Sequence, residues 1–259
     1  MPLAHTNIIG IAWANPVAHG ALLLICIRSL AAQSLDPKPG SIQDFSTSFA
    51  LPHEFSFEPE IQSGTQGNST NGNPFAYGHG MQIRPWVHYD GIPKATITGA
   101  ASYIYYFTVP ETSNYKHPEW RFTVFGTLRQ GFSGGSLYEQ VRLELLDFRG
   151  NNGVVQHLSR VRFRFGQNLY LSEGASKPYL GLYEEAITQY PQTSYSSVHF
   201  QRARFFAGYG FEYRKRAHFL LGFKAEAEVS SSGSTVTFFS RSCVQLRIPF
   251  HQKRTKRKT

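Results

Sequence analysis

The stretch QRARFFAGYGFEYR, residues 201–214, constrains the fold more than any other part of this sequence. Its odd positions are nearly all apolar or aromatic, whereas its even positions are mostly charged or glycine. Successive side chains of a β-strand point to opposite faces, so this alternation predicts one two-faced strand. With about 14 residues, the predicted strand is far longer than the usual strand of about 5–6 residues.

The same alternation recurs along most of the chain, and no segment has the pattern of an amphipathic helix. No run of about 18 apolar residues predicts a transmembrane helix either. The sequence therefore predicts an all-β fold. The expected strands are residues 54–63, 77–90, 95–109, 119–130, 137–148, 157–171, 179–187, 201–214, 218–229 and 235–250.

Two architectures satisfy this pattern, and they differ in which face of the strands meets water. In a soluble sandwich or barrel the apolar faces point inward and the charged faces are solvated. In an outer-membrane barrel the apolar faces contact lipid and the charged faces fill the lumen. Alternation alone does not choose between them, because each is the inversion of the other.

Four features favour the membrane architecture. The expected strands are long enough to cross a bilayer at a tilt, which takes about 9–11 residues. Their apolar faces are rich in Phe and Tyr, and their polar faces carry both Arg and Glu. Longer connections near 64–76, 110–118 and 188–199 alternate with tight ones near 91–94, 131–135 and 214–217. We predict a closed antiparallel up-and-down transmembrane β-barrel of about ten strands, or about twelve, with a filled polar lumen.

The segments on either side of the predicted barrel resemble a cleavable signal at the N-terminal side and a basic tail at the C-terminal side. Residues 1–32 resemble a secretory signal, because small residues follow an apolar run at 21–27. The signal is atypical, because no Lys or Arg precedes the apolar run. We assign 33–52 to a linker, 53–250 to the barrel and 251–259 to a basic tail. That tail, HQKRTKRKT, holds five Lys and Arg of a net charge of +9, which leaves the rest near +4. Without a helix carrying a basic stripe, we expect no nucleic-acid partner.

The charges of the polar faces are expected to neutralise one another, because a confined lumen cannot hold unpaired charges cheaply. We predict a structural network rather than a catalytic or metal site, and we expect Gly208 and Gly210 to relieve crowding in the lumen. The predicted network comprises Arg142, Glu144, Arg160, Arg162, Arg164, Arg202, Arg204, Glu212, Arg214, Glu226 and Glu228.

Few residues suggest chemistry. The two cysteines, Cys26 and Cys243, predict neither a disulfide framework nor a zinc site, and no cofactor-binding motif is present. His157 and Ser159 lie on one face of an expected strand, as a lipid-hydrolysing barrel enzyme would require together with a third residue that orients the imidazole. Neither belongs to a nucleophile motif, so we expect no catalytic residue, with an outer-membrane lipid hydrolase as the alternative.

Four segments carry a resemblance to a known family. EQVRLELLDFRGN, SRVRFRFGQNLYL, PYLGLYEEAI and RARFFAGYGFEYR resemble, in this order, the bacterial family called domain of unknown function 2490. The resemblance covers roughly residues 53–250. It implies a signal-bearing outer-membrane β-barrel with no established activity, in contact with outer-membrane lipid and with the barrel-assembly machinery during biogenesis. The poor signal and the nine residues after Phe250 depart from that pattern.

These observations predict a barrel of the bacterial outer membrane with a structural or minor transport role. Besides the lipid hydrolase, a second alternative is a soluble β-sandwich that binds carbohydrate, with Trp86 and Trp120 as stacking platforms. The sequence leaves the oligomeric state open.

Overall fold

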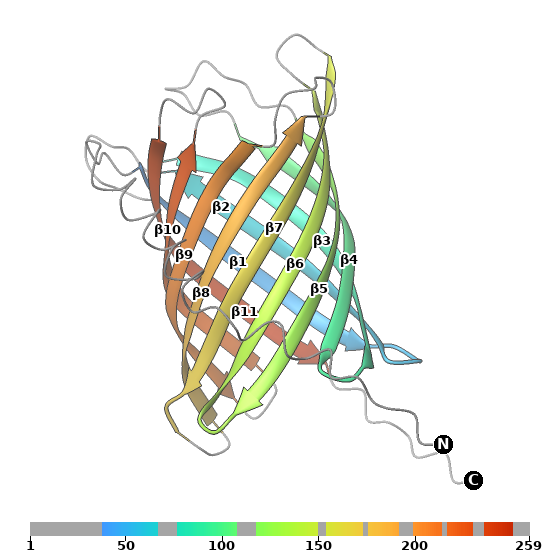
Figure 1. The fold of residues 1–259 in the computed structure, drawn as a ribbon, viewed down its shortest axis with the longest axis vertical. Coiled ribbons are helices and arrows are strands. Elements are labelled where there is room, and N and C mark those ends of the chain that lie inside the picture. The colour runs from blue at the N-terminus through green and yellow to red at the C-terminus, as the bar shows by residue number, and fades with distance from the viewer. Residues whose placement is uncertain are drawn as a thin grey trace, which may run out of the picture. The chain divides into compact units, whose positions relative to one another are not determined.

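The protein forms a closed β-barrel (Figure 1). The computed structural model describes residues 38–66, 77–107, 118–149, 154–172, 176–191, 199–213, 217–229 and 236–250, and all elements below lie in these ranges. The strands are β1 (Lys38–Ala50), β2 (Phe55–Gln66), β3 (Tyr77–Ile92), β4 (Ala95–Tyr106), β5 (Glu119–Phe132), β6 (Gly135–Arg149), β7 (Val155–Tyr170), β8 (Ser176–Pro191), β9 (His199–Tyr213), β10 (Ala217–Val229) and β11 (Val236–Phe250).

The ten strands expected from alternation are all present, and an eleventh precedes them. β1 occupies Lys38–Ala50, where the sequence was interpreted as linker, so that assignment and the strand count of ten or twelve are wrong. The segment was missed because Pro39, Gly40 and several serines weaken its alternation. The signal predicted at 1–32 and the tail at 251–259 lie outside the described residues.

The barrel closes with an odd number of strands, so neighbouring strands cannot all be antiparallel. Consecutive strands pair antiparallel from β1 to β11, but alternation around a closed ring requires an even number of strands. One pair must therefore be parallel, and it is β1 with β11, in register from Lys38 opposite Phe239 to Phe49 opposite Phe250. The prediction of a wholly antiparallel barrel is corrected at this single seam.

The up-and-down topology sorts the connections between the two ends of the barrel. The connections across 67–76, 107–118, 150–154, 192–198 and 230–235 join strands at one end. The connections across 51–54, 93–94, 133–134, 171–175 and 214–216 join them at the other. We call these the long-connection end and the tight-turn end. β1 and β11 both run from the former to the latter.

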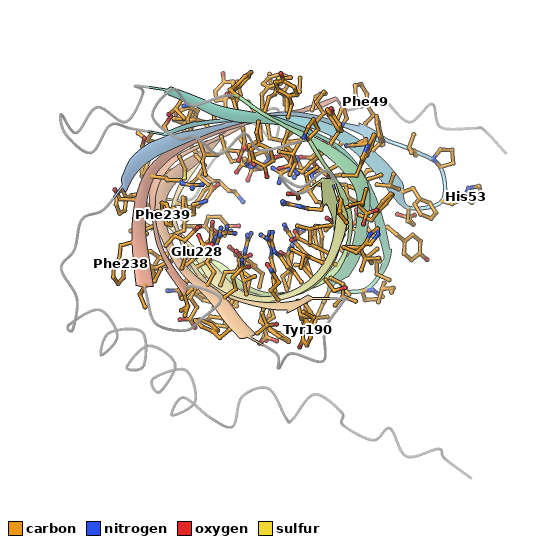
Figure 2. All side chains as sticks on the ribbon, turned by 90° about the horizontal axis from the view of Figure 1, so that it is seen from above. Phe49, His53, Tyr190, Glu228, Phe238 and Phe239 are labelled. Carbon is orange, nitrogen blue, oxygen red and sulfur yellow. The ribbon has the colours of Figure 1, made fainter. Side chains whose placement is uncertain are left out.

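The wall of the barrel has an apolar outer face and a polar inner face (Figure 2). Adjacent residues differ sharply: Leu143 is 54% exposed and Glu144 is 2%, while Phe163 is 53% exposed and Arg162 is 6%. Alternation therefore inverts the usual arrangement of a water-soluble protein. The closed ring also excludes the β-sandwich alternative. None of the described residues forms a helix long and apolar enough to span a membrane.

Aromatic rings on the inner face lie across glycines of the same strand or of a neighbouring one. The Phe206 ring covers Gly208 and Gly222, and the Tyr179 ring covers Gly210, so closely that an added Cβ would collide with either ring. Phe206 is also stacked on Tyr183 at 4.9 Å between ring centroids. The expectation that Gly208 and Gly210 relieve crowding inside the barrel agrees with this packing.

Candidate functional site

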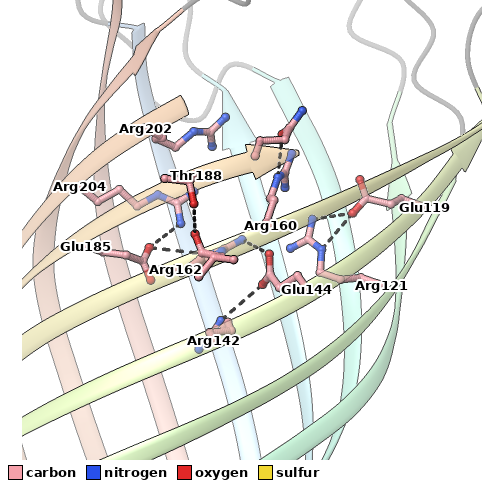
Figure 3. A network of polar contacts seen from close by, with 12 residues as sticks. Glu119, Arg121, Arg142, Glu144, Arg160, Arg162, Glu185, Thr188, Arg202 and Arg204 are labelled. Atoms are coloured by element: carbon pink, nitrogen blue, oxygen red, sulfur yellow. Dashed lines mark hydrogen bonds and ion pairs between the residues drawn. The ribbon is translucent and has the colours of Figure 1, made fainter. Parts of the chain in front are cut away.

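Inward-facing charges from β6 to β10 form a continuous set of ion pairs, which we call the lumen network (Figure 3). These strands are adjacent in the barrel and their polar faces share one side, so every second residue contributes to the same surface. Eight of the residues predicted for the network make its ion pairs: Arg142, Glu144, Arg162, Arg164, Arg202, Arg204, Glu226 and Glu228.

The centre of the lumen network is Glu185 on β8, which the predicted set did not include. Its side chain has no solvent exposure. Its Oε1 accepts from Arg164 Nη2 at 2.9 Å, and its Oε2 accepts from Arg204 Nη1 at 2.9 Å. Arg162 Nη1 lies 3.8 Å from the same Oε2. One buried carboxylate thus contacts three guanidinium groups.

Two further carboxylates extend the network to either side. Glu144 on β6 lies 2.7 Å from Arg162 Nη2 and 3.8 Å from Arg142 Nη1. Glu226 on β10 lies 2.5 Å from Arg204 Nε and 2.8 Å from Arg202 Nη1. Arg204 therefore joins the carboxylates of two strands on either side of its own, the bidentate use to which a guanidinium is suited.

The remaining predicted members have different positions. Arg160 donates from Nε to the Gln189 side chain at 3.0 Å. Glu212 lies opposite Lys177 and His218 in the strand register. Arg214 lies outside the described residues. Glu119 and Arg121, an ion pair at 2.6 Å on β5, belong to the same inner surface although the prediction omitted them.

A second group of inward charges crosses the parallel seam. Arg247 on β11 lies 2.6 Å from Glu58 on β2, so this pair reaches over β1. Arg84 on β3 pairs with Glu60, whose other oxygen accepts from the Trp86 indole at 2.5 Å. Because Arg247 and Glu58 come from opposite sides of the seam, their contact helps to hold the ring closed, whereas Arg84, Glu60 and Trp86 lie on one side of it.

The two tryptophans proposed as a carbohydrate platform lie on opposite sides of the wall. Trp86 is 6% exposed and faces the lumen, where it meets Phe125 edge-on at 5.4 Å. Trp120 is 51% exposed on the outer face, beside Tyr103 at 5.0 Å. One sugar ring cannot stack on both, so the two tryptophans do not form a shared stacking surface.

A third polar group lies on the outer face, near the long-connection end of β6 and β7. His157 Nδ1 and Asp147 Oδ1 are 2.6 Å apart, and the two side chains are 47% and 43% exposed. Ser159 follows on the same face of β7, opposite Leu145 on β6 and Tyr190 on β8. The sequence indicated His157 and Ser159, but it gave no sign of Asp147.

No group of His, Cys, Asp and Glu within the described ranges has the geometry of a metal site. Cys243 is a free thiol on the inner face of β11, opposite Ile42, and Cys26 lies outside the described residues. Two candidate groups follow from these contacts: the ion-paired side chains of the lumen, and the His157–Asp147 pair on the outer wall with Ser159 on the same face.

One known family matches nearly the whole of the barrel. The family described as protein of unknown function (DUF2490) matches residues 44–256. The chain belongs to this family. The DUF2490 match begins within β1, six residues after its first residue, and so includes the seam strand that the sequence interpretation placed outside the barrel. None of the curated proteins matches the chain.

Proposed function

We propose that this DUF2490 protein is an integral β-barrel of the bacterial outer membrane with a structural role, and that its ion-paired lumen does not serve as a wide solute channel. The observation that carries the proposal is the apolar outer face. Large hydrophobic side chains are exposed on every strand from β1 to β10. Exposed apolar patches on soluble monomers rarely exceed a few hundred Å². A bilayer removes this unfavourable exposure.

The distribution of aromatic residues on the outer face supports the same placement. Exposed aromatic side chains gather toward both strand ends, as in the interfacial girdles of outer-membrane barrels. Near the long-connection end they are Tyr105, Phe107, Trp120, Tyr190 and Phe200, and near the tight-turn end they are Phe49, Phe55, Phe132 and Tyr213. Closure adds a second argument, because every strand has two hydrogen-bonded neighbours and lipid meets no open edge.

The lumen network supports a structural rather than a channel role. Three of its carboxylates, Glu144, Glu185 and Glu226, are almost fully buried, and each contacts more than one arginine. Aromatic rings such as Phe206 occupy part of the same interior. Side chains held in this way rigidify the wall, and the lumen of a barrel with so few strands is narrow.

Two cysteine variants of nearly equal exposure test the membrane placement. Leu143 is 54% exposed in mid-strand on the outer face, and Val154 is 58% exposed just before β7. In a background with Cys26 and Cys243 replaced by serine, Leu143→Cys in outer-membrane vesicles should resist a water-soluble maleimide, whereas Val154→Cys should react.

Solubilisation and denaturation should make the two positions equally reactive. Fractionation should recover the protein with the outer membrane, and unheated samples should migrate differently from boiled ones on gels. Rapid labelling of both cysteines in a detergent-free soluble fraction would refute the proposal.

A further inference from the structure

We propose that Ser159, His157 and Asp147 form a serine-hydrolase site on the outer wall that cleaves carboxylic esters of membrane lipids. The three residues come from two adjacent strands of one hairpin, β6 and β7, and all face away from the lumen. Their order along the wall is that of a nucleophile, a base and a carboxylate that orients the base.

The contact between His157 and Asp147 fixes which ring nitrogen is available as a base. An ionised carboxylate only accepts hydrogen bonds, so the 2.6 Å contact places the proton of a neutral imidazole on Nδ1. Nε2 then carries the lone pair, as a general base requires. An ion pair this exposed contributes little to the free energy of folding. A stabilising role alone therefore does not explain why His157 and Asp147 are paired here.

Ser159 lies two residues after His157 on the same outer face. That spacing places their backbones about 7 Å apart along the strand, a separation that an imidazole and a hydroxymethyl group bridge between them. Catalytic hydrogen bonds commonly shorten only when substrate binds. Tyr190 lies directly opposite Ser159 on β8 and is 37% exposed, so its phenol supplies a hydroxyl donor on the other side of the nucleophile.

The depth of this site on the wall identifies the class of substrate. Tyr103, Trp120, Asp147 and His157 are successive cross-strand partners on β4 to β7 and form one row at the long-connection end. Tyr and Trp favour the boundary between headgroups and acyl chains. Toward mid-strand, Leu143 and Phe163 are more than half exposed and offer an apolar surface to an acyl chain. An ester carbonyl at Ser159 would then lie at the boundary.

The reaction follows from these positions. His157 Nε2 accepts the Ser159 hydroxyl proton as Oγ bonds to the ester carbonyl carbon, and the carbonyl electron pair moves onto oxygen. The bond to the alcohol oxygen then breaks, and the departing alcohol takes the proton from His157. Water, deprotonated by the same nitrogen, attacks the acyl-serine. A free fatty acid leaves and Ser159 is regenerated. No other co-reactant is needed.

Only the substrate class rests on the proposed membrane function. If the protein were soluble, the same three residues would still act on a short-chain, water-soluble ester. Hydrolysis of p-nitrophenyl butyrate and of micellar lipid esters therefore tests the two proposals separately.

The test uses the full chain, purified in detergent and shown to be folded by heat-modifiable migration. A fluorophosphonate probe should label the wild type, and labelling should disappear in Ser159→Ala. The control Ser240→Ala changes an outer-face serine of β11, remote from β7 in the strand order, and should be labelled like the wild type. Fatty-acid release by His157→Ala should fall by about 1000-fold or more.

Separate mixed micelles of phospholipid and of lipopolysaccharide would show which lipid supplies the ester. Asp147→Asn should lower kcat by roughly 100-fold or more with little change in KM, because it acts through His157 and not on bound substrate. A merely structural pair would leave kcat unchanged. Folded wild-type protein that neither takes the probe nor releases acid from any of the three esters would overturn the proposal.

Discussion

Replacement of Glu185 by glutamine would remove the central negative charge of the lumen network while nearly preserving its shape. Glu185 has no exposed side-chain surface and contacts Arg162, Arg164 and Arg204. Two of these contacts are hydrogen bonds of 2.9 Å to different carboxylate oxygens. The amide retains one acceptor oxygen, but its nitrogen would face an arginine donor, so one close contact becomes a donor–donor clash.

The expected cost is large because the arginines remain buried. Removing one partner of a buried ion pair costs about 3–5 kcal/mol, since it leaves uncompensated charge in a poorly solvated place. Arg204 keeps Glu226 and Arg162 keeps Glu144, whereas Arg164 has no second ion-pair partner among the contacts described above. We therefore expect the free energy of unfolding to fall by about 3 kcal/mol, toward the lower end of that range.

The neighbouring residue provides a matched control. Glu184 lies on the outer face of β8, opposite Phe165 and Phe205, so Glu184→Gln makes the same chemical change on the other side of the wall. Removing an outward charge should change stability by less than about 1 kcal/mol or raise it slightly in lipid. Urea unfolding in lipid vesicles, followed by tryptophan fluorescence, measures both variants. Equal losses for Glu184→Gln and Glu185→Gln would refute the assignment of inner and outer faces.

Two further predictions test the packing and the closure of the ring. In the same urea titration, Gly166→Ala should destabilise the barrel by about 1–3 kcal/mol, because the added Cβ would collide with the Tyr138 ring. The control Gly126→Ala should be nearly neutral, because a Cβ at Gly126 meets nothing within 4 Å. Equal effects would mean that the ring does not lie over Gly166. Ile42→Cys, in a chain lacking Cys26, should form a disulfide with Cys243, its partner across the parallel seam, because adjacent strands lie about 4.8 Å apart. Mobility on non-reducing gels detects the disulfide, and Ser46→Cys is the control. A disulfide formed by Ser46→Cys but not by Ile42→Cys would contradict the register between β1 and β11.

Alternation was sufficient to predict ten strands and which residues share a face. Strand length and the composition of the faces were needed to predict which face points outward, and the strand count was wrong. The ten predicted strands agree with the structure because most of them carry charges on one face and large apolar groups on the other. β1 lacks that contrast: its outer face has Ser41 and Gln43 beside Phe45 and Phe49. β1 is held as a strand by hydrogen bonds to β2 and β11 on either side. The sequence of β1 alone does not indicate which strands it pairs with.

The lumen network was predictable in kind but not in its centre. Three successive inward positions of β7 are arginines, at 160, 162 and 164, and they require carboxylates on the adjacent strands. Glu144 lies opposite Arg160 on β6. On β8, however, two glutamates are adjacent in sequence and lie on opposite faces. Choosing Glu185 over Glu184 required the pairing of β8 with β7, which places Glu185 opposite Arg164.

On the outer wall, the register between β6 and β7 decides whether the residues of the proposed hydrolase site lie together. The sequence places His157 and Ser159 on one face, and any register that keeps the apolar face outward preserves that relation. A shift of two residues between β6 and β7 would preserve it too, but it would put Leu145 rather than Asp147 opposite His157. The imidazole would then have no carboxylate to hold its proton on Nδ1. The proposed hydrolase site therefore depends on the register between β6 and β7. The membrane proposal rests on which face of each strand points outward, and a shift of two residues leaves that unchanged.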